Sequence, residues 1–437
     1  MKNRQFIWAY LAQFLKIGSG VLLLPVALTY LSAEEMGYWY IFLAMTSLVQ
    51  LLEVGCQPTI SRLTAYVLSG ATSIRKDGVP NISVNVKPEL LTAMIVSSRS
   101  IYIKISLFVS LAFIGPGTYY LMSFDSFNKD IMIAWAVYVL ATIIDFYFSY
   151  YSGLIIGKGK QTEVFKAVAI SKAVVLFCSI PLLYYEFGLL ALSIGSLLST
   201  FIARYLLRRV FLSNFSADLK LNKEQETTRE EAYSAIYENS KKLSVTGLGN
   251  FLILRSGAFF ASSFVGLEAA ASYGLTMQLV GIVSSLSTLI FTLEVPKLNQ
   301  LQVKKEFIKI KALFKNRIVS ANLIYIVGCA GIWFCSEFIF PYFEFNTELL
   351  SLNCLIVLCI VQLLDLNHSI CATYLTTLNQ VPFMVSSVIS GIGVIILSYL
   401  LVIDFGILGV ILSRGIVQAL YNNWKWPLSV YYNFKVQ

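Results

Sequence analysis

The segment LLEVGCQPTISRL, residues 51–63, places Glu53, Gln57, Pro58 and Arg62 inside a long apolar stretch that begins at YWYIFLAMTSLVQ. A soluble helix turns such groups toward water, but the apolar residues around them leave no face for water. An ionisable group at the centre of a bilayer costs at least about 2.5–3.5 kcal/mol, so it faces a bundle interior or a water-filled cavity. We therefore expect Glu53 to face a polar interior shared by several helices, with lipid on the other side of its helix.

The composition indicates a membrane-embedded chain. Of the 437 residues, 57% are hydrophobic and only 13% are charged, with a mean hydropathy of +0.72, whereas a soluble globular protein is about a quarter charged. The net charge of +9 comes from basic residues scattered in short loops, which is typical of orientation in a membrane and not of a nucleic-acid partner. The seven cysteines form no CxxC pair, so we expect no disulfide framework, no metal site and no cofactor.

The apolar segments predict an all-α integral membrane protein. A hydrocarbon core about 30 Å thick needs roughly 20 apolar residues per helix. The chain contains about twelve apolar segments of this length. The N-terminal segment has no small-residue cleavage site and is expected to be retained as the first span. The predicted spans are 6–29, 38–66, 101–123, 132–156, 164–184, 189–210, 243–265, 271–295, 317–340, 349–375, 383–402 and 407–430.

The loops between these spans predict the orientation. One alternating set carries the basic residues, for example GKGK and KLNQLQVKKEFIKIKALFKNR, whereas the other set is acidic, with Lys129 as its only basic residue. Because basic loops stay in the cytoplasm, we expect both termini to be cytoplasmic. The outward loops, each of about ten residues or fewer, are too short to hold a domain.

The two halves of the chain resemble each other. YEFGLLALSIGSLLS in the first half matches IDFGILGVILSRGIV in the second, and LSAEEMGYWY matches VGLEAAASYGL. Six spans per half keep corresponding spans in the same direction, so the repeat is parallel, with a pseudo-two-fold axis along the membrane normal. This predicts a six-helix lobe at 1–210, a cytoplasmic linker at 211–242 and a second six-helix lobe at 243–437.

Charged residues inside the spans are the candidate site. Cations exceed acids, so the interior is expected to attract an anion, and guanidinium groups are the usual partners of phosphates. The candidate cargo-binding cations are Lys16, Arg62, Lys172, Arg204, Arg255 and Arg414, and the candidates for ion coupling are Glu53, Asp145, Asp365 and His368.

Structural roles compete with these assignments. Glu53 and Asp145 could pair with Lys16 or Lys172 and hold helices together. Arg62 and Arg204 lie within snorkelling distance of the cytoplasmic interface. His368, the chain's one histidine, is either a proton carrier beside Asp365 or a hydrogen-bonded interior residue.

The string YLSAEEMGYWYIFLAMTSLVQLLEVGCQPTISR resembles the opening signature of bacterial polysaccharide flippases of the O-antigen type. These belong to the multidrug/oligosaccharidyl-lipid/polysaccharide exporter superfamily. The resemblance rests on an acidic pair and a glycine after the first span, then an acid, a glycine and a basic residue on the second. These places are held by Glu34, Glu35, Gly37, Glu53, Gly55 and Arg62. The chain departs from the family at its seventh span, where Leu254 stands before Arg255 in place of an acid.

The resemblance implies a transporter without enzymatic activity in the bacterial inner membrane. Its cargo would be a polyprenyl-pyrophosphate-linked oligosaccharide, such as an O-antigen or capsule repeat unit, moved to the outer face by alternating access through a cationic central cavity. Glycan polymerase and chain-length proteins would be its partners. Two alternatives remain open. An ion-coupled drug antiporter of the same superfamily would need an acidic cavity, and a membrane glycan polymerase or ligase would need a larger outward loop.

Overall fold

The computed structural model describes residues 2–75, 87–219, 226–295, 298, 301–302, 306–339, 342, 345–378 and 383–436. Its helices in the first half of the chain are α1 (Lys2–Tyr30), α2 (Ala33–Val54), α3 (Cys56–Leu68), α4 (Pro88–Ala112), η1 (Phe113–Gly117), α5 (Thr118–Met122), α6 (Lys129–Phe148), α7 (Tyr150–Gly157), α8 (Gln161–Tyr184) and α9 (Leu189–Leu219). The second half holds α10 (Glu226–Leu254), α11 (Ser256–Phe264), α12 (Leu267–Thr292), α14 (Phe307–Phe334), η2 (Cys335–Ile339), α15 (Leu352–Thr376), α16 (Met384–Leu420) and α17 (Asn422–Val436).

These helices confirm the predicted all-α membrane architecture with about twelve spans. Within the described residues, nine helices are long and apolar enough to cross a membrane. One of these, Val385–Lys435, covers two of the predicted spans. The non-helical backbone of Gly406 in α16 separates them. The predicted linker, 211–242, is largely helical, since α9 and α10 extend into it, and its residues 220–225 lie outside the described part.

The chain divides into two compact units. The first comprises Met1–Leu31 and Met45–Gly247, and the second comprises Ser32–Ala44 and Leu248–Gln437. The chain therefore crosses between the units three times. The first crossing lies between α1 and α2, and the other two fall inside the continuous helices α2 and α10. The second unit includes Ser32–Ala44, whereas the predicted first lobe, 1–210, contains this segment. The boundaries of the predicted lobes stay a prediction.

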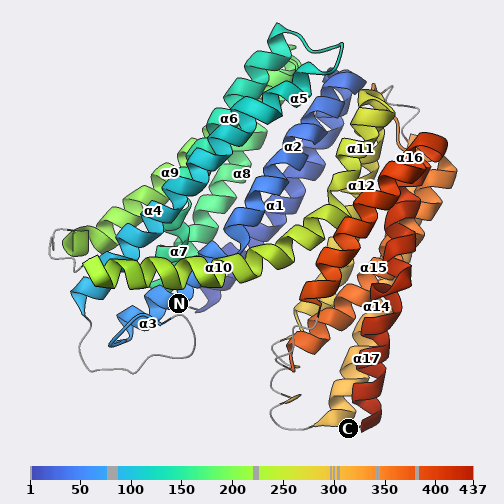
Figure 1. Ribbon diagram of the computed structural model, residues 1–437. Coiled ribbons are helices and arrows are strands. Elements are labelled where there is room, and N and C mark those ends of the chain that lie inside the picture. The colour runs from blue at the N-terminus through green and yellow to red at the C-terminus, as the bar shows by residue number, and fades with distance from the viewer. Residues whose placement is uncertain are drawn as a thin grey trace. The chain divides into compact units, whose positions relative to one another are not determined.

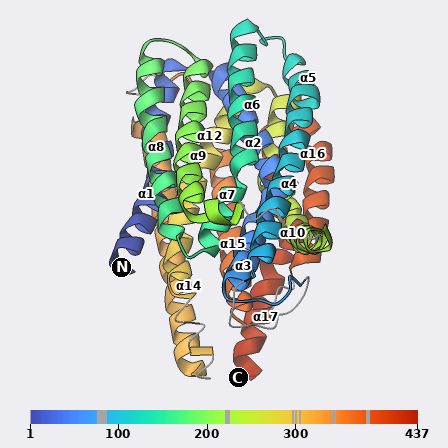
Figure 2. The ribbon, with the colours of Figure 1, turned by 90° about the vertical axis from the view of Figure 1, so that its left-hand side faces the viewer.

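The first unit is built around α6, α8 and α9, which lie side by side in Figure 2. The start of α10 runs across the ends of α4 and α7 in Figure 1. It packs there through Ala232, Ala235 and Ile236, which are completely buried, and the Ser97 hydroxyl donates to the Arg229 carbonyl at 3.0 Å. Because alanines have short side chains, this helix approaches the unit closely.

The second unit includes the start of α2, which packs against α12. A capping box begins α2: the Glu35 amide donates to the Ser32 hydroxyl, and the Ser32 amide donates to the Glu35 carboxylate. Further along, the Tyr40 hydroxyl donates to Gln278 Oε1 on α12 at 2.9 Å. A Cβ on Gly274 would lie 2.3 Å from Tyr40 Cγ, so only glycine allows this approach.

Four helix contacts of the first unit have counterparts in the second, as an internal repeat predicts. The pairs α1–α8, α6–α9, α3–α7 and α4–α6 of the first unit correspond to α11–α16, α15–α17, α12–α15 and α14–α15 of the second. The turns in the two matching strings also agree, since Gly188 and Gly406 have φ values of 56° and 54°. Left-handed backbone of this kind favours glycine.

The segment 51–63 is bent, as its proline predicts. Helix α2 ends at Val54 and α3 begins at Cys56, so the break falls at Gly55. Proline has no amide hydrogen, so Pro58 cannot donate to the carbonyl four residues before it and weakens the helix one turn earlier. Gly55 also lies so close to Ser240 of α10 that an added Cβ would be 2.3 Å from the Ser240 carbonyl oxygen.

Candidate functional site

A cluster of charged and hydroxyl groups lies inside the first unit. Arg204 of α9 donates from Nε to Asp145 Oδ1 of α6 at 2.9 Å, and its Nη2 lies 2.9 Å from the same oxygen. Its other donors reach Ser149 at 3.2 Å and Ser152 at 3.3 Å. Ser149 in turn donates to Glu53 Oε1 of α2. The guanidinium is therefore shared between one carboxylate directly and a second through a hydroxyl.

This first-unit cluster is acidic. It holds two carboxylates, Glu53 and Asp145, and one guanidinium, Arg204, so it carries one excess negative charge when both acids are ionised. The Arg204 side chain is 12% exposed and the Asp145 side chain is 42% exposed. The Tyr102 hydroxyl of α4 also donates to Glu53, at 3.2 Å. The accessible charge of the cluster is thus the Asp145 carboxylate.

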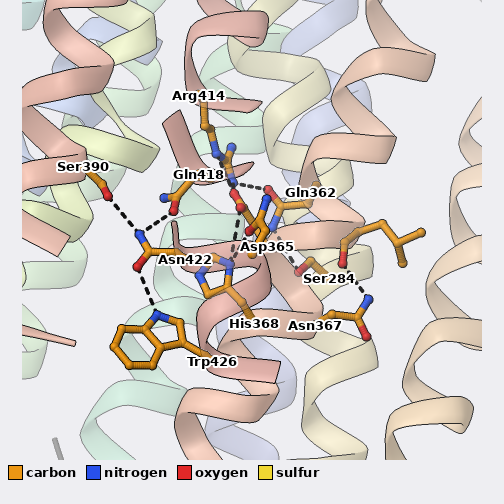
Figure 3. A network of polar contacts seen from close by, with 12 residues as sticks. Ser284, Gln362, Asp365, Asn367, His368, Ser390, Arg414, Gln418, Asn422 and Trp426 are labelled. Atoms are coloured by element: carbon orange, nitrogen blue, oxygen red, sulfur yellow. Dashed lines mark hydrogen bonds and ion pairs between the residues drawn. The ribbon is translucent and has the colours of Figure 1, made fainter. Parts of the chain in front are cut away.

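The second unit contains an ion pair between the corresponding helices, drawn in Figure 3. Arg414 of α16 donates from Nε to Asp365 Oδ2 of α15 at 2.8 Å, and its Nη2 lies 2.6 Å from the same oxygen. Nη2 also donates to Gln362 at 2.6 Å, and Gln362 donates to Ser284 of α12 at 3.3 Å. With side-chain exposures of 3% for Arg414 and 7% for Asp365, this pair is buried.

His368 lies one turn beyond Asp365 on α15. Its Nδ1 is 2.7 Å from Asn423 Oδ1 of α17 and 3.6 Å from Asp365 Oδ1. The histidine is thus a hydrogen-bonded interior residue, which was one of its two predicted roles. The proton-carrier role remains a proposal.

A second polar chain in this unit contains Gln418 and Asn422, which helical spacing predicts on one face with Arg414. Its other members, Ser390 and Trp426, were not predicted. The Asn422 side chain of α17 donates to Ser390 at 2.9 Å and to Gln418 at 2.7 Å, and it accepts from Trp426 Nε1 at 3.0 Å. All four residues are buried, and Figure 3 shows their contacts. The spacing of Gln418, Asn422 and Trp426 at every fourth residue was the available signal, because it places them on one helical face.

Arg255 differs from the other deep arginines. It lies at the break between α10 and α11, where its backbone leaves helical geometry with φ −121°, and its side chain is exposed. Its charge is within electrostatic range of Tyr273 and Arg414. Among the described residues, no carboxylate forms an ion pair with Arg255.

The same helix break depends on a close contact with α12. Tyr273, which is buried, places its hydroxyl where a Cβ on Gly257 would be only 2.3 Å away. Gly257 follows Arg255 by two residues, so this contact fixes the turn from which the guanidinium projects. A larger residue at this position would push α11 away from α12.

Three further cations were predicted for the site. The side chain of Lys16 lies outside the described residues. Arg62 is exposed on α3 and Lys172 is half-buried on α8, and both have interactions of their own. The pairing of Glu53 or Asp145 with a lysine was the structural alternative for these acids, but the partner of Asp145 is Arg204. The described residues contain no group of His, Cys, Asp and Glu side chains arranged to hold a metal ion.

Comparison with known proteins gives the fold. No family model and no curated protein matches the chain. Among solved structures, the inward-facing conformation of a multidrug resistance MATE family transporter of the MOP superfamily matches with a TM-score of 0.73 at 11% identity, covering 98% of this chain and 96% of that one. The lipid II flippase MurJ, in its inward closed conformation, matches with a TM-score of 0.61 at 13% identity, covering 98% and 87%. A point mutant of the Vibrio cholerae MATE transporter VcmN matches with a TM-score of 0.60 at 10% identity, covering 100% and 97%.

These likenesses confirm the predicted fold, which the exporter superfamily shares. The similar structures are transporters and not enzymes. Identities this low say nothing about cargo, because one fold carries many functions.

Proposed function

We propose that this chain is a flippase. Its cargo is a polyprenyl-pyrophosphate-linked oligosaccharide, such as an O-antigen or capsule repeat unit, moved by alternating access from the cytoplasmic to the outer face of the bacterial inner membrane. Both termini are then cytoplasmic. The proposal combines the resemblance of residues 30–62 to polysaccharide flippases with a fold that a lipid II flippase also adopts.

The observation that carries the proposal is the guanidinium of Arg255. An arginine inside a membrane protein normally has an anionic partner, because an unpaired charge away from water is costly. Arg204 and Arg414 have carboxylate partners within their own units, but Arg255 has none among the described residues. It is also exposed. A guanidinium in this state is suited to bind a phosphate group of the cargo.

The energetics of export agree with an anionic cargo. A pyrophosphate carries about two negative charges, and its outward movement from a negative cytoplasm is favoured by roughly 2.3 kcal/mol per charge per 100 mV. The polyprenyl tail can remain in the bilayer throughout. Arg255 is the proposed primary cargo ligand, and Lys16, Arg62, Lys172, Arg204 and Arg414 are secondary candidates. Glu53, Asp145, Asp365 and His368 are the candidates for ion coupling.

Transport in proteoliposomes tests this function. The probe is a fluorescent short-chain polyprenyl pyrophosphate N-acetylglucosamine, whose movement between leaflets is followed by quenching from outside. We expect the wild-type protein to move the probe faster than empty liposomes do. Arg255→Ala should slow it by about tenfold to a hundredfold, because a hydrogen bond to a charged group contributes about 1.5–3 kcal/mol.

The matched controls are Arg255→Lys and Arg209→Ala. Lysine keeps the charge, so Arg255→Lys should retain part of the activity. Arg209 is exposed on α9 near the Tyr205 ring, and its loss should leave transport unchanged. Full activity of Arg255→Ala at matched protein levels would remove the central support for an anionic cargo.

A second candidate function follows from the first-unit cluster. Two carboxylates around one guanidinium, with Asp145 partly exposed, suit a cationic cargo, and a multidrug transporter shares the fold. An ion-coupled antiporter would accumulate ethidium in the same proteoliposomes under a proton or sodium gradient. Ethidium transport without movement of the lipid probe would replace the flippase assignment by this one.

A further inference from the structure

The ion pair of the second unit leaves one carboxylate oxygen without a donor. Both Arg414 nitrogens that meet Asp365 point to the same oxygen, Oδ2. Asp365 Oδ1 is buried and has no hydrogen-bond partner among the described residues. An unsatisfied buried acceptor is unfavourable, and more so when it is charged.

An imidazole lies near this oxygen. His368 Nδ1 lies 3.6 Å from Asp365 Oδ1, slightly too far for a hydrogen bond, and 2.7 Å from Asn423 Oδ1. Asn423 Nδ2 is also buried, with no partner in the described part of the chain. The histidine therefore stands between two oxygen atoms, one of which still lacks a donor.

We propose that His368 is a proton-binding site, and that its protonated form shares Asp365 with Arg414, so that proton uptake and anion binding are linked within the second unit. The link to anion binding rests on the proposed function. An imidazolium donates from both nitrogens, and a small movement of the ring brings Nδ1 to the vacant Oδ1. The carboxylate then has a second cationic partner, and Arg414 is held less tightly.

The charges of this cluster give the direction of the link. When His368 is neutral, the charges of Asp365 and Arg414 cancel, and the positive charge of Arg255 is left in excess. Protonation adds one positive charge, so anion affinity rises as the pH falls. By reciprocity, a bound anion favours the protonated form by the same factor.

The neighbouring elements contribute no other acid to this cluster within the described residues. Helices α12, α14, α16 and α17 all contact α15. Arg414 on α16 is held by Asp365, and Arg317 on α14 is paired with Glu294. Helix α17 places the neutral Asn423 beside the ring, with Lys425 two residues further along. The partner oxygen of a protonated His368 is therefore that of Asp365.

Nuclear magnetic resonance tests the proton site directly. His368 is the chain's single histidine, so full-length protein labelled at histidine gives one imidazole signal. We expect the chemical shift of this signal to change with pH as the ring takes up a proton. An unchanging signal would show a purely structural histidine and overturn the proposal.

Binding of inorganic pyrophosphate tests the link. Affinity is measured at about pH 6 and about pH 8 for the wild type, His368→Gln and His368→Asn. Each variant serves as the reference that removes the probe's own pH dependence. The ratio of the affinity at about pH 6 to the affinity at about pH 8 should be about fivefold or more larger for the wild type than for either variant. Equal ratios in the three proteins would overturn the link.

The two proposals fail in different ways. If pyrophosphate does not bind the wild type at either pH, the anionic-cargo function fails. If pyrophosphate binds but the imidazole signal is constant, only the His368 proposal fails.

Discussion

Asp145 and Asp365 hold matching places in the two units, and each forms an ion pair with an arginine on a later helix of its own unit. Asp145 of α6 pairs with Arg204 of α9, and Asp365 of α15 pairs with Arg414 of α16. The sequences around them also match, with a polar residue three positions before and a serine four positions after each aspartate, in TIIDFYFS and QLLDLNHS. The repeat therefore extends from helix packing to an interior ion pair.

The two pairs differ in burial, which predicts different effects of the same substitution. Asp365→Asn leaves Arg414 buried without a charged partner, and loss of one member of a buried pair costs about 3–5 kcal/mol. Asp145→Asn should cost less, within about 1 kcal/mol, because the Asp145 side chain is 42% exposed and its pair is weakened by solvent.

The measurement is the free energy of unfolding in mixed detergent micelles. Both variants are isosteric, so packing is the same and each serves as the control for the other. Equal losses would mean that the difference in exposure does not govern the strength of these pairs.

The spans could be predicted from the sequence because hydropathy and loop charge act over whole segments. The breaks at Gly55 and Gly406 also had local signals, Pro58 and the IDFG turn. The division of α2 between the units had no such signal. It depends on the contact of Gly274 with Tyr40, which are more than 200 residues apart.

The candidate site was predictable in its residues but not in its pairs. Their position inside the predicted spans identified Glu53, Asp145, Asp365 and Arg414 as interior groups. It could not identify Arg204 as the partner of Asp145, because spacing along one helix does not say which residue of another helix lies opposite. Arg414 and Asp365 are likewise on separate helices, so neither predicts the other.

Gly274 and Gly281 on α12 should respond in opposite ways to alanine. A Cβ on Gly274 would lie 2.3 Å from Tyr40 Cγ. This ring atom is close to the backbone, so the side chain cannot swing away without moving α2. Overpacking of this kind costs about 1–3 kcal/mol. Gly281 has nothing within 4 Å of an added Cβ, so alanine there should be neutral or stabilising by up to about 1 kcal/mol.

The two glycine variants are compared by thermal unfolding of the purified proteins. Gly281→Ala is the control for the general effect of alanine in this helix. A Gly274→Ala protein as stable as the wild type would contradict the close packing of α2 on α12.

The turn at Gly406 predicts a cost for any side chain. Its φ of 54° with ψ −132° is a conformation in which a side chain is strained by about 1–3 kcal/mol. Gly406→Ala should lower the unfolding temperature accordingly.

In the matching turn, Glu186 has φ 60°, and Asn tolerates this region better than Glu does. Glu186→Asn should therefore stabilise the protein by about 0.5 kcal/mol, and a loss of stability there would contradict the strain argument.

Glu53→Gln tests whether the first-unit cluster takes up a proton during transport. Glutamine keeps a side-chain oxygen to accept hydrogen bonds from Ser149 and Tyr102 but removes one of the two negative charges around Arg204. Carboxylates inside membrane spans are candidates for proton relays in transporters. We expect the Glu53→Gln transport rate to change less with pH than the wild-type rate does, because the dependence that His368 contributes remains. Glu268→Gln, at an exposed acid in the first turn of α12, should behave as the wild type does. If Glu53→Gln keeps the wild-type pH profile, Glu53 is a structural acceptor for Ser149 and Tyr102, and ion coupling must be sought at Asp365 and His368.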